Sequence, residues 1–239
     1  MWRPVTVAAG KAETARARTL TLLVPDWTSH RPGQHVDVRL TADDGYQAVR
    51  SYSIASAPES PTVDLTVELV DDGEVSSYLV EEARAGDAFE VRGPLGGYFV
   101  WTVDDGGPLF LVAGGSGLVP LMSMLRHRRA RCAPVFVRAL VSARALGDLL
   151  YADELVEIGK DDAAEVQIAL TRDAPPDWAG HTRRIDREML AEAGWAPNER
   201  PRVYVCGPTG FVETAGALLV DLGHDAGRIR TERFGPTGG

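Results

Sequence analysis

The spacing of apolar residues divides the chain into two regions. In residues 1–103, short runs of alternating apolar and polar residues are separated by turns rich in glycine, proline and aspartate. The runs predicted to be strands are 19–24, 36–40, 63–70 and 89–92. A period of two is typical of strands with one buried face, so this region is predicted to be an antiparallel sandwich or barrel. One short helix is expected to begin near Val75.

From residue 108 onward, continuous apolar runs alternate with segments of helical periodicity. The runs predicted to be strands are 109–113, 135–137, 166–170, 202–206 and 229–234. Leu118, Leu121 and Leu125 lie on one side of the helix predicted after the first of these strands. Strands that are apolar throughout are typical of a parallel sheet covered on both faces, so an α/β domain is predicted.

The polar, Gly/Pro-rich stretch 104–108 is predicted to join the two regions. It places one domain at residues 1–103 and a second at 108–239. A chain of 239 residues is long enough for two separate cores.

Composition and charge restrict the possible partners. The formal net charge of -9 disfavours nucleic acid or an anionic membrane as the main partner. No run approaches the ~20 apolar residues of a membrane span, and the first residues lack the apolar core of a signal peptide. We therefore expect a soluble, cytoplasmic protein.

Cysteine usage bears on metal and redox chemistry. The sequence holds only two cysteines, Cys132 and Cys206. An iron–sulfur cluster takes four protein ligands, so any such relay is expected on another polypeptide, and no metal site is predicted. So few cysteines also favour a reducing compartment.

A glycine-rich turn opens the second region. Gly114-Gly115-Ser116-Gly117 directly follows an apolar strand and precedes a helix. Glycines allow close approach of the backbone to a pyrophosphate, and the helix start supplies N–H groups and partial positive charge. The spacing matches neither G-x-G-x-x-G nor a Walker motif, so a plain tight turn is the alternative.

Arg50-Ser51-Tyr52-Ser53 ends a predicted strand of the first region. Arginine can fork onto a phosphate, tyrosine can stack on a flat heterocycle, and serine can hydrogen-bond a ring nitrogen. The alternative is an edge strand with an exposed arginine and a packed tyrosine.

Four motifs in order resemble the ferredoxin–NADP(+) reductase superfamily, over nearly the whole chain. They are Arg50-x-Tyr52-Ser53, Gly73-Glu74-Val75-Ser76, the glycine turn with Leu118-Val119-Pro120, and Cys206-Gly207-Pro208. The chain looks like a stand-alone bacterial flavin-domain reductase without a fused iron–sulfur domain. The resemblance implies a six-stranded antiparallel β-barrel that binds FAD, followed by a parallel-sheet α/β domain that binds NAD(P).

The resemblance also implies roles on the flavin side. Arg50 would bind the flavin phosphate, Tyr52 would stack on the isoalloxazine, and Ser53 would approach N5, the hydride acceptor. Ser76 would be the second pyrophosphate ligand, which favours FAD over FMN; no adenine contact is identified. The expected flavin-binding residues are Arg50, Tyr52, Ser53, Val67, Leu69, Gly73, Val75 and Ser76. The Pro32-Gly33-Gln34 turn is expected to be structural, and His35 to be a packed strand residue rather than a proton carrier.

On the nicotinamide side, the resemblance assigns the pyrophosphate to Gly115, Ser116 and Gly117, and adds Gly207 and Pro208 as cofactor contacts. Cys206 would lie beside nicotinamide C4, while Cys132 has no implied role. Near the end of the chain, Phe234 would cover the flavin face, with Glu232 close to Ser53 and Cys206. Ser53, Cys206 and Glu232 are therefore the predicted catalytic residues.

Arginines favour NADPH over NADH, although NADH is possible. Arg144, Arg172 and Arg184 follow predicted strands of the α/β region, as does Arg183, and they resemble residues that hold the 2′-phosphate in bacterial relatives.

We therefore expect hydride transfer from NAD(P)H to bound FAD, with electrons passed to an external ferredoxin, oxygenase or molybdenum-enzyme component. The alternatives are a free-flavin or ferric-siderophore reductase, and a non-catalytic regulatory subunit. A monomer is expected.

Overall fold

The computed structural model describes residues 1–235 and separates into two compact units. Unit 1 consists of Met1–Thr102 and Met122–Arg131. Unit 2 consists of Val103–Leu121 and the residues from Cys132 onward.

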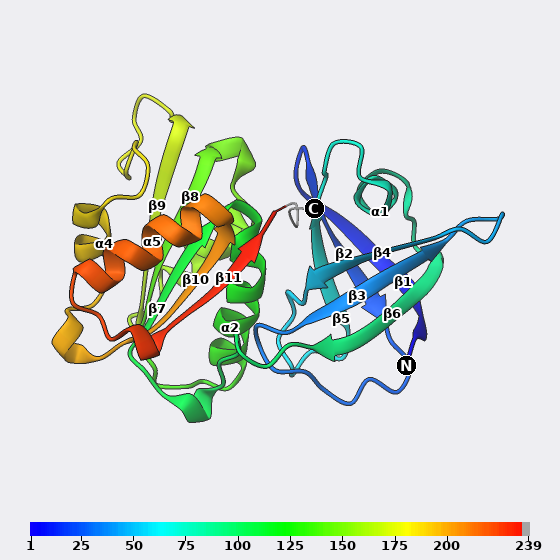
Figure 1. Cartoon of the computed structure of the whole chain (residues 1–239), viewed down its shortest axis with the longest axis horizontal. Helices are drawn as coiled ribbons and strands as arrows, with labels where there is room; N and C mark the ends of the chain where they lie inside the picture. Colours follow the sequence, from blue (N-terminus) through cyan, green and yellow to red (C-terminus); the bar gives the residue numbers. More distant parts are fainter. Residues whose placement is uncertain (236–239) are drawn as a thin grey trace. The chain divides into compact units, whose positions relative to one another are not determined.

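Unit 1 contains a six-stranded antiparallel sheet (Figure 1). Its strands are β1 (Arg3–Thr14), β2 (Ala17–Leu23), β3 (His35–Thr41), β4 (Gln47–Ser53), β5 (Val63–Glu68) and β6 (Ala88–Leu95). They lie in the order β4-β3-β6-β1-β2-β5. An antiparallel bridge joins Ile54, directly after β4, to Leu65 of β5, the other outer strand. The six-stranded antiparallel architecture is confirmed.

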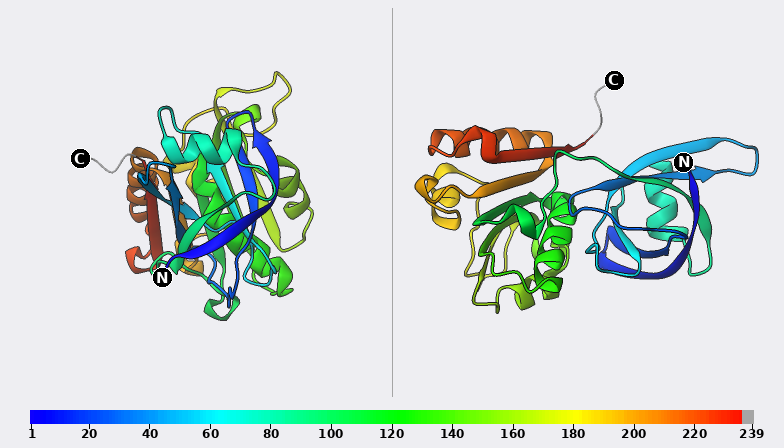
Figure 2. Two further views of the ribbon diagram at one scale, coloured as in Figure 1. Left: turned by 90° about the vertical axis from the view of Figure 1, so that its right-hand side faces the viewer. Right: turned by 90° about the horizontal axis from the view of Figure 1, so that it is seen from below.

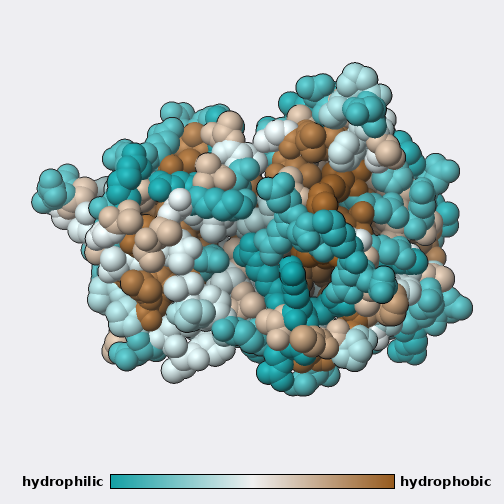
Figure 3. Space-filling model, turned by 180° about the vertical axis from the view of Figure 1, so that it is seen from behind, coloured by the Kyte–Doolittle hydropathy of each residue, from teal (hydrophilic) through white to brown (hydrophobic). Residues whose placement is uncertain are grey.

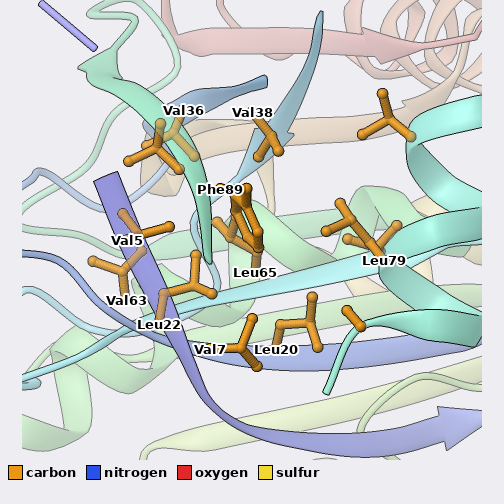
Figure 4. Close-up of a cluster of buried hydrophobic side chains, with 14 of the residues drawn as sticks. Val5, Val7, Leu20, Leu22, Val36, Val38, Val63, Leu65, Leu79 and Phe89 are labelled. Atoms are coloured by element: carbon orange, nitrogen blue, oxygen red, sulfur yellow. The ribbon is translucent and has the colours of Figure 1, made fainter. Parts of the chain in front are cut away.

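The core of unit 1 follows from the alternation of apolar residues along its strands. Val5 and Val7 of β1, Leu20 and Leu22 of β2, and Val36 and Val38 of β3 are all almost completely buried. Figure 4 shows these side chains pointing toward one another, together with Leu79. Leu79 lies in the π-helical turn Tyr78–Glu82 that follows the short helix α1 (Glu74–Ser77).

Unit 2 contains a five-stranded parallel sheet. Its strands are β7 (Leu109–Gly114), β8 (Val137–Ala145), β9 (Ala164–Asp173), β10 (Arg202–Pro208) and β11 (Ile229–Phe234), in the order β11-β10-β7-β8-β9. Its helices are α2 (Leu118–Ala130), α3 (Ala152–Ile158), α4 (Arg187–Ala193) and α5 (Thr209–Asp221), although most of α2, from Met122 onward, belongs to unit 1. The predicted α/β architecture with a parallel sheet is confirmed.

Both faces of the parallel sheet are covered, as the continuous apolar strands predict. Phe110 and Val112 of β7 pack in a cluster with residues of α4 and α5. Leu109 and Leu111 alternate with them and are equally buried on the opposite face. Figure 2 shows helices on both sides of this sheet.

One predicted strand has other bounds in the structure, and one strand was not predicted. The strand predicted at 135–137 begins only at Val137 and continues to Ala145, because pairing with β7 and β9 extends it through arginine, serine and alanine residues. Strand β1 was not predicted, since only Val5 and Val7 of its twelve residues are buried and the rest is polar or small.

The surface agrees with the moderate hydropathy of the sequence. On the face shown in Figure 3, polar residues form most of the surface and apolar residues lie in separate patches. Within residues 1–235, no helix is both long and apolar enough to cross a membrane.

Candidate functional site

The turn before β3 is built around Gln34. Its side-chain carbonyl accepts a hydrogen bond from the Arg31 N–H (2.7 Å), and its amide donates to the Gly96 carbonyl (2.6 Å). Its backbone carbonyl accepts from the Ile54 N–H (3.0 Å), directly after β4. The turn therefore fixes where β4 ends, which agrees with the structural role expected for it.

Strand β4 presents Arg50 and Tyr52 on one face and Ser51 and Ser53 on the other. Arg50 is exposed, and its guanidinium donates to the Val49 carbonyl (2.7 Å). It forms no ion pair with any carboxylate in residues 1–235, so its charge is available to a phosphate. Burial raises the pKa of Tyr52 to about 12, which keeps its phenol neutral.

Ser53 is the clearest sign of a ligand on this strand. The residue is 6% exposed, and its Oγ has no hydrogen-bond partner among the described residues. A buried hydroxyl without a partner costs about 1–3 kcal/mol. A heterocyclic nitrogen or carbonyl of a bound flavin would supply the missing partner, so the residue fits the group that the sequence implies.

Asp37, which belongs to none of the sequence motifs, supports β4 from the neighbouring strand β3. Asp37 lies opposite Ser51 on β4 and Arg92 on β6. Its carboxylate accepts from Ser51 Oγ (2.6 Å) and from Arg92 Nη2 (2.5 Å). Burial opposes ionisation, but these two donors outweigh it and lower the pKa of Asp37. An aspartate within the apolar alternation of 36–40 was the available signal.

The predicted flavin-binding residues in β5 and the segment after it make hydrogen bonds and packing contacts within the protein. The Ser76 hydroxyl accepts from the Val70 N–H (3.1 Å) and donates to the Gly73 carbonyl (3.1 Å), so it closes the turn before α1. The Leu69 N–H donates to the Arg16 carbonyl (2.7 Å). The side chains of Val67 and Val75 are buried in the core. Flavin contacts from these residues stay predictions, and would come from backbone groups such as the N–H groups at the start of α1.

In unit 2 the glycine turn packs against the end of β10. A Cβ on Gly117 would lie 2.1 Å from the Cys206 carbonyl oxygen and 2.5 Å from the Gly207 nitrogen, so only glycine fits there. Gly115 has a φ of +55° and open space around it, and Ser116 is half-buried. The turn leads directly into α2, whose first N–H groups have no intrahelical partner. This arrangement suits an anion such as a pyrophosphate.

Cys206 and Glu232 lie side by side at the carboxyl edge of the sheet. Cys206 on β10 is paired in register with Ala113 of β7 and Glu232 of β11. Burial, with a further contribution from Glu232, raises the pKa of the Cys206 thiol well above its usual value. Burial raises the pKa of Glu232 to about 7. The Cys206 thiol is therefore a neutral hydrogen-bond donor at neutral pH, whereas Glu232 can gain or lose a proton there. Two residues further along the same two strands, Pro208 is paired with Phe234.

The predicted 2′-phosphate arginines lie toward one edge of this sheet. A bulge in the β8–β9 pairing places Arg144 opposite 171–172, between the pairs Ala143–Leu170 and Ala145–Asp173. A parallel bridge between Ala169 and His181 brings the 181–184 segment alongside β9. Arg144, Arg172 and Arg184 are exposed and form no ion pair within the described residues, whereas Arg183 pairs with Asp186 and Glu188.

The remaining candidates have simpler surroundings. His35 lies opposite Ser53, and burial lowers its pKa, which is consistent with a packed neutral ring. Cys132 is exposed and free. Within residues 1–235, no three His, Cys, Asp or Glu side chains are placed to hold a metal ion.

Comparison with known families matches both halves of the chain. Residues 6–100 match the oxidoreductase FAD-binding domain family, and residues 111–216 match the oxidoreductase NAD-binding domain family. The barrel residues and the glycine turn described above fall within these two matches.

Curated relatives give the same assignment. The chain is 34% identical over 214 residues to ferredoxin--NADP reductase B of Sorangium cellulosum, with 84% of each chain covered. It is 33% identical over 226 residues to a flavohemoprotein of Bacillus cereus, covering 87% of this chain and 54% of the relative. It is 34% identical over 214 residues to the glycine betaine monooxygenase reductase subunit of Pseudomonas aeruginosa, covering 87% and 57%. The chain thus spans about half the length of these last two relatives.

Solved structures share the fold. The FAD/NAD-binding domain of nitric oxide dioxygenase from Vibrio cholerae superposes with a TM-score of 0.86 at 24% identity, covering 98% of this chain and 99% of the other. The cytochrome P450 reductase of Amycolatopsis gives a TM-score of 0.83 at 26% identity, covering 99% and 71%. With an FAD-binding domain followed by an NAD-binding domain, this chain belongs to the ferredoxin–NADP reductase family of FAD-containing NAD(P)H reductases.

Proposed function

We propose that the chain takes hydride from NADPH onto bound FAD and passes the electrons to a separate acceptor protein. The observation that carries the proposal is the buried Ser53 hydroxyl, which has no partner among the described residues at the end of β4. Bound flavin would supply the redox chemistry, because it accepts electrons as a pair and releases them singly or together.

The chain's own residues hold the reactants and control protons. Arg50, without a carboxylate partner, binds the flavin phosphate, and neutral Tyr52 packs against the ring. The Ser53 hydroxyl and the Cys206 thiol provide uncharged hydrogen-bonding groups near the reacting atoms. Glu232, with a pKa of about 7, can hold or release a proton at neutral pH.

The preference for NADPH rests on the exposed arginines at the edge of β8 and β9. A 2′-phosphate is best bound by several guanidinium groups, and Arg144, Arg172 and Arg184 have no carboxylate in the described residues to compete for them. NADH lacks this phosphate and would gain nothing from these arginines.

The acceptor is inferred to be an oxygenase component or a ferredoxin. One relative is the reductase subunit of a monooxygenase, and one structural neighbour is a cytochrome P450 reductase. Since these 239 residues contain only two cysteines, a four-cysteine cluster that receives the electrons would have to lie outside them. A molybdenum-enzyme component as the electron acceptor stays a prediction. A cytoplasmic location and a monomeric state also stay predictions.

An anaerobic experiment tests the proposal. The purified chain, loaded with FAD, is mixed with NADPH while the visible flavin absorption is followed. We expect rapid bleaching, then recovery when ferricyanide or an oxidised ferredoxin is added. Binding of both cofactors without bleaching would instead indicate the non-catalytic regulatory subunit. Steady turnover with free FMN or a ferric siderophore, and none with any protein acceptor, would indicate the small-molecule reductase.

A further inference from the structure

Tyr46 is a rigidly held aromatic residue with an exposed ring. Its N–H donates to Asp44 Oδ1 (2.9 Å), and its carbonyl accepts from the Ala42 N–H (2.9 Å) in the turn between β3 and β4. Its hydroxyl donates to Glu74 Oε2 (3.0 Å). The residue is nevertheless 57% exposed. The ring is thus fixed at its backbone and at its tip, while much of its surface meets solvent.

Glu74 places this ring beside the start of α1. Glu74 is the first residue of α1, and Gly73 precedes it. A Cβ built on Gly73 would lie 3.1 Å from Val70 Cβ, so Val70 lies against the same corner of the chain. Val70 is 61% exposed. Two exposed apolar side chains, Tyr46 and Val70, therefore flank the corner formed by Gly73 and Glu74.

The order of residues along β4 matches the order of groups in FAD. Tyr52, Arg50 and Tyr46 follow one another backward along the strand and its turn, and α1 lies beside this strand (Figure 1). Four extended residues span about 13 Å, which separates Tyr46 from Arg50. FAD likewise carries its isoalloxazine, pyrophosphate and adenosine in sequence. Tyr46 thus lies at the end of the row where adenosine would follow the phosphates.

The positive charge of Arg50 influences the pKa values of both tyrosines. The hydrogen bond to Glu74 raises the pKa of Tyr46, and burial raises the pKa of Tyr52 to about 12. The charge of Arg50 acts in the opposite direction on each of them. An exposed tyrosine alone needs no ligand. This one stands beside a predicted phosphate ligand and an exposed valine, with its orientation already fixed.

We propose that Tyr46 and Val70 bind the adenine of FAD, Tyr46 by stacking and Val70 by apolar contact. The pair makes the flavin site selective for FAD over FMN, which lacks the adenosine. The proposal rests on the flavin site proposed above and adds its specificity-determining residues. Glu74 is a positioning residue, because it acts by orienting the Tyr46 ring.

The test compares FAD with FMN binding to the apoprotein of the whole chain, using flavin fluorescence. For Tyr46→Ala we expect the Kd for FAD to rise about tenfold, as for loss of one base–aromatic stack, and the Kd for FMN to change less than about twofold. Tyr46→Phe keeps the stacking ring but loses its hydrogen bond to Glu74, so its Kd for FAD should rise by at most about threefold, as in Glu74→Ala, while its Kd for FMN stays unchanged. Leu23→Ala removes an equally exposed apolar residue from β2 and should change neither Kd.

Two further variants keep the test decisive if Tyr46→Ala does not fold. Val70→Asp places an anion at the proposed adenine face, and Glu74→Ala frees the tyrosine ring. Both should lower the FAD-to-FMN affinity ratio. Equal losses for the two flavins, or an unchanged ratio in all variants, would overturn the adenine assignment. A wild-type apoprotein that binds neither flavin would instead overturn the flavin function itself.

Discussion

Arg172 is the residue through which the choice of nicotinamide cofactor can be tested. It lies at the carboxyl end of β9, exposed and without a carboxylate partner in the described residues. Arg172→Gln removes one charge-assisted hydrogen bond, so we expect the KM for NADPH to rise about tenfold. The KM for NADH should change less than about twofold, because NADH carries no 2′-phosphate. Steady-state reduction of ferricyanide measures both.

The matched control for Arg172 is Arg129→Gln, which removes an exposed arginine from α2. It should leave both KM values unchanged. If Arg172→Gln weakened NADH and NADPH equally, the residue would contact a part common to both cofactors, and the NADPH preference would lose its main support.

Glu232 makes a prediction about pH. Burial raises its pKa from 4.5 in the unfolded chain to about 7 in the folded one. The folded state therefore binds this proton more tightly than the unfolded chain does. The contribution of proton binding at Glu232 to the free energy of unfolding is fully present below about pH 4.5 and is lost as pH rises to about 7. Glu232→Gln cannot titrate, so its free energy of unfolding should fall less between about pH 5 and pH 8 than that of the wild type.

Urea unfolding of the whole chain at several pH values measures this difference. The conservative change Glu192→Gln, at an exposed glutamate of α4, is the control and should keep the wild-type pH dependence. Identical pH dependence for Glu232→Gln and the wild type would show that Glu232 is already ionised at low pH.

Residue types could be predicted from the sequence more readily than their surroundings. Arg50, Tyr52 and Ser53 were identified from their order in a motif, but the missing partner of Ser53 is a property of packing and appears only in the structure. Asp37 was missed because its importance depends on Ser51 and Arg92, which are remote in sequence and meet it only through strand register. Ser76 was expected to be a pyrophosphate ligand, which stays a prediction, and the sequence did not reveal that its hydroxyl also closes a local turn.

At the scale of elements, Asp37 connects three strands and supports the flavin motif. Asp37→Asn removes the charge that Arg92 and Ser51 share, leaving β4 less firmly held against β3 and β6. We expect a loss of about 2–3 kcal/mol of stability, since a buried charged hydrogen-bond network is broken. We also expect FAD affinity to fall several-fold, because Arg50 and Tyr52 flank Ser51 on the same strand. Flavin titration of the apoprotein and urea unfolding measure the two effects.

Glu90→Gln is the control for this network. Glu90 pairs with Arg39 across the same strands β3 and β6 (2.7 Å), but this ion pair does not include β4. It should lower FAD affinity less than Asp37→Asn does. A stability loss in Asp37→Asn with unchanged FAD affinity would limit Asp37 to a role in folding.

The periodicity of apolar residues predicted the kind of each sheet, because burial of one face or both determines the pattern directly. It could not predict strand order or register. The glycine turn illustrates the limit: Gly117 was identified as a ligand-binding residue, yet a side chain there is already excluded by the carbonyl of Cys206. That contact joins elements about ninety residues apart, and no local pattern contains it.

At the scale of the whole molecule, the division into units departs from a simple cut in the sequence. The polar stretch 104–108 predicted a boundary, and the first segment of unit 1 ends at Thr102. Residues Met122–Arg131, however, return to unit 1. Ser123 Oγ donates to the Ser56 carbonyl (2.7 Å), and Arg126 donates to the Ala55 carbonyl (2.9 Å). Composition indicates that 104–108 is a polar linker. It does not indicate that α2 will pack on the loop at residues 55–56, which is distant in sequence.

The stability of unit 1 should therefore depend on a helix outside residues 1–103. His127 is buried, and its Nδ1 lies 2.9 Å from Glu59 Oε1, while its ring meets Trp101 edge-on at 6.0 Å. His127→Ala removes both contacts and leaves a cavity, so we expect unit 1 to lose about 2–4 kcal/mol of stability.

Thermal unfolding of the FAD-loaded chain, followed by the fluorescence of released flavin, measures this loss. The flavin should be released at a temperature several degrees lower in His127→Ala than in the wild type, because the barrel loses support supplied by α2. Arg129→Ala, on the exposed side of the same helix, should leave the release temperature unchanged. Equal release temperatures for His127→Ala and wild type would mean that residues 1–103 hold the flavin without help from α2. In that case the polar stretch at 104–108 would mark the energetic boundary of the flavin domain as well as its boundary in the sequence.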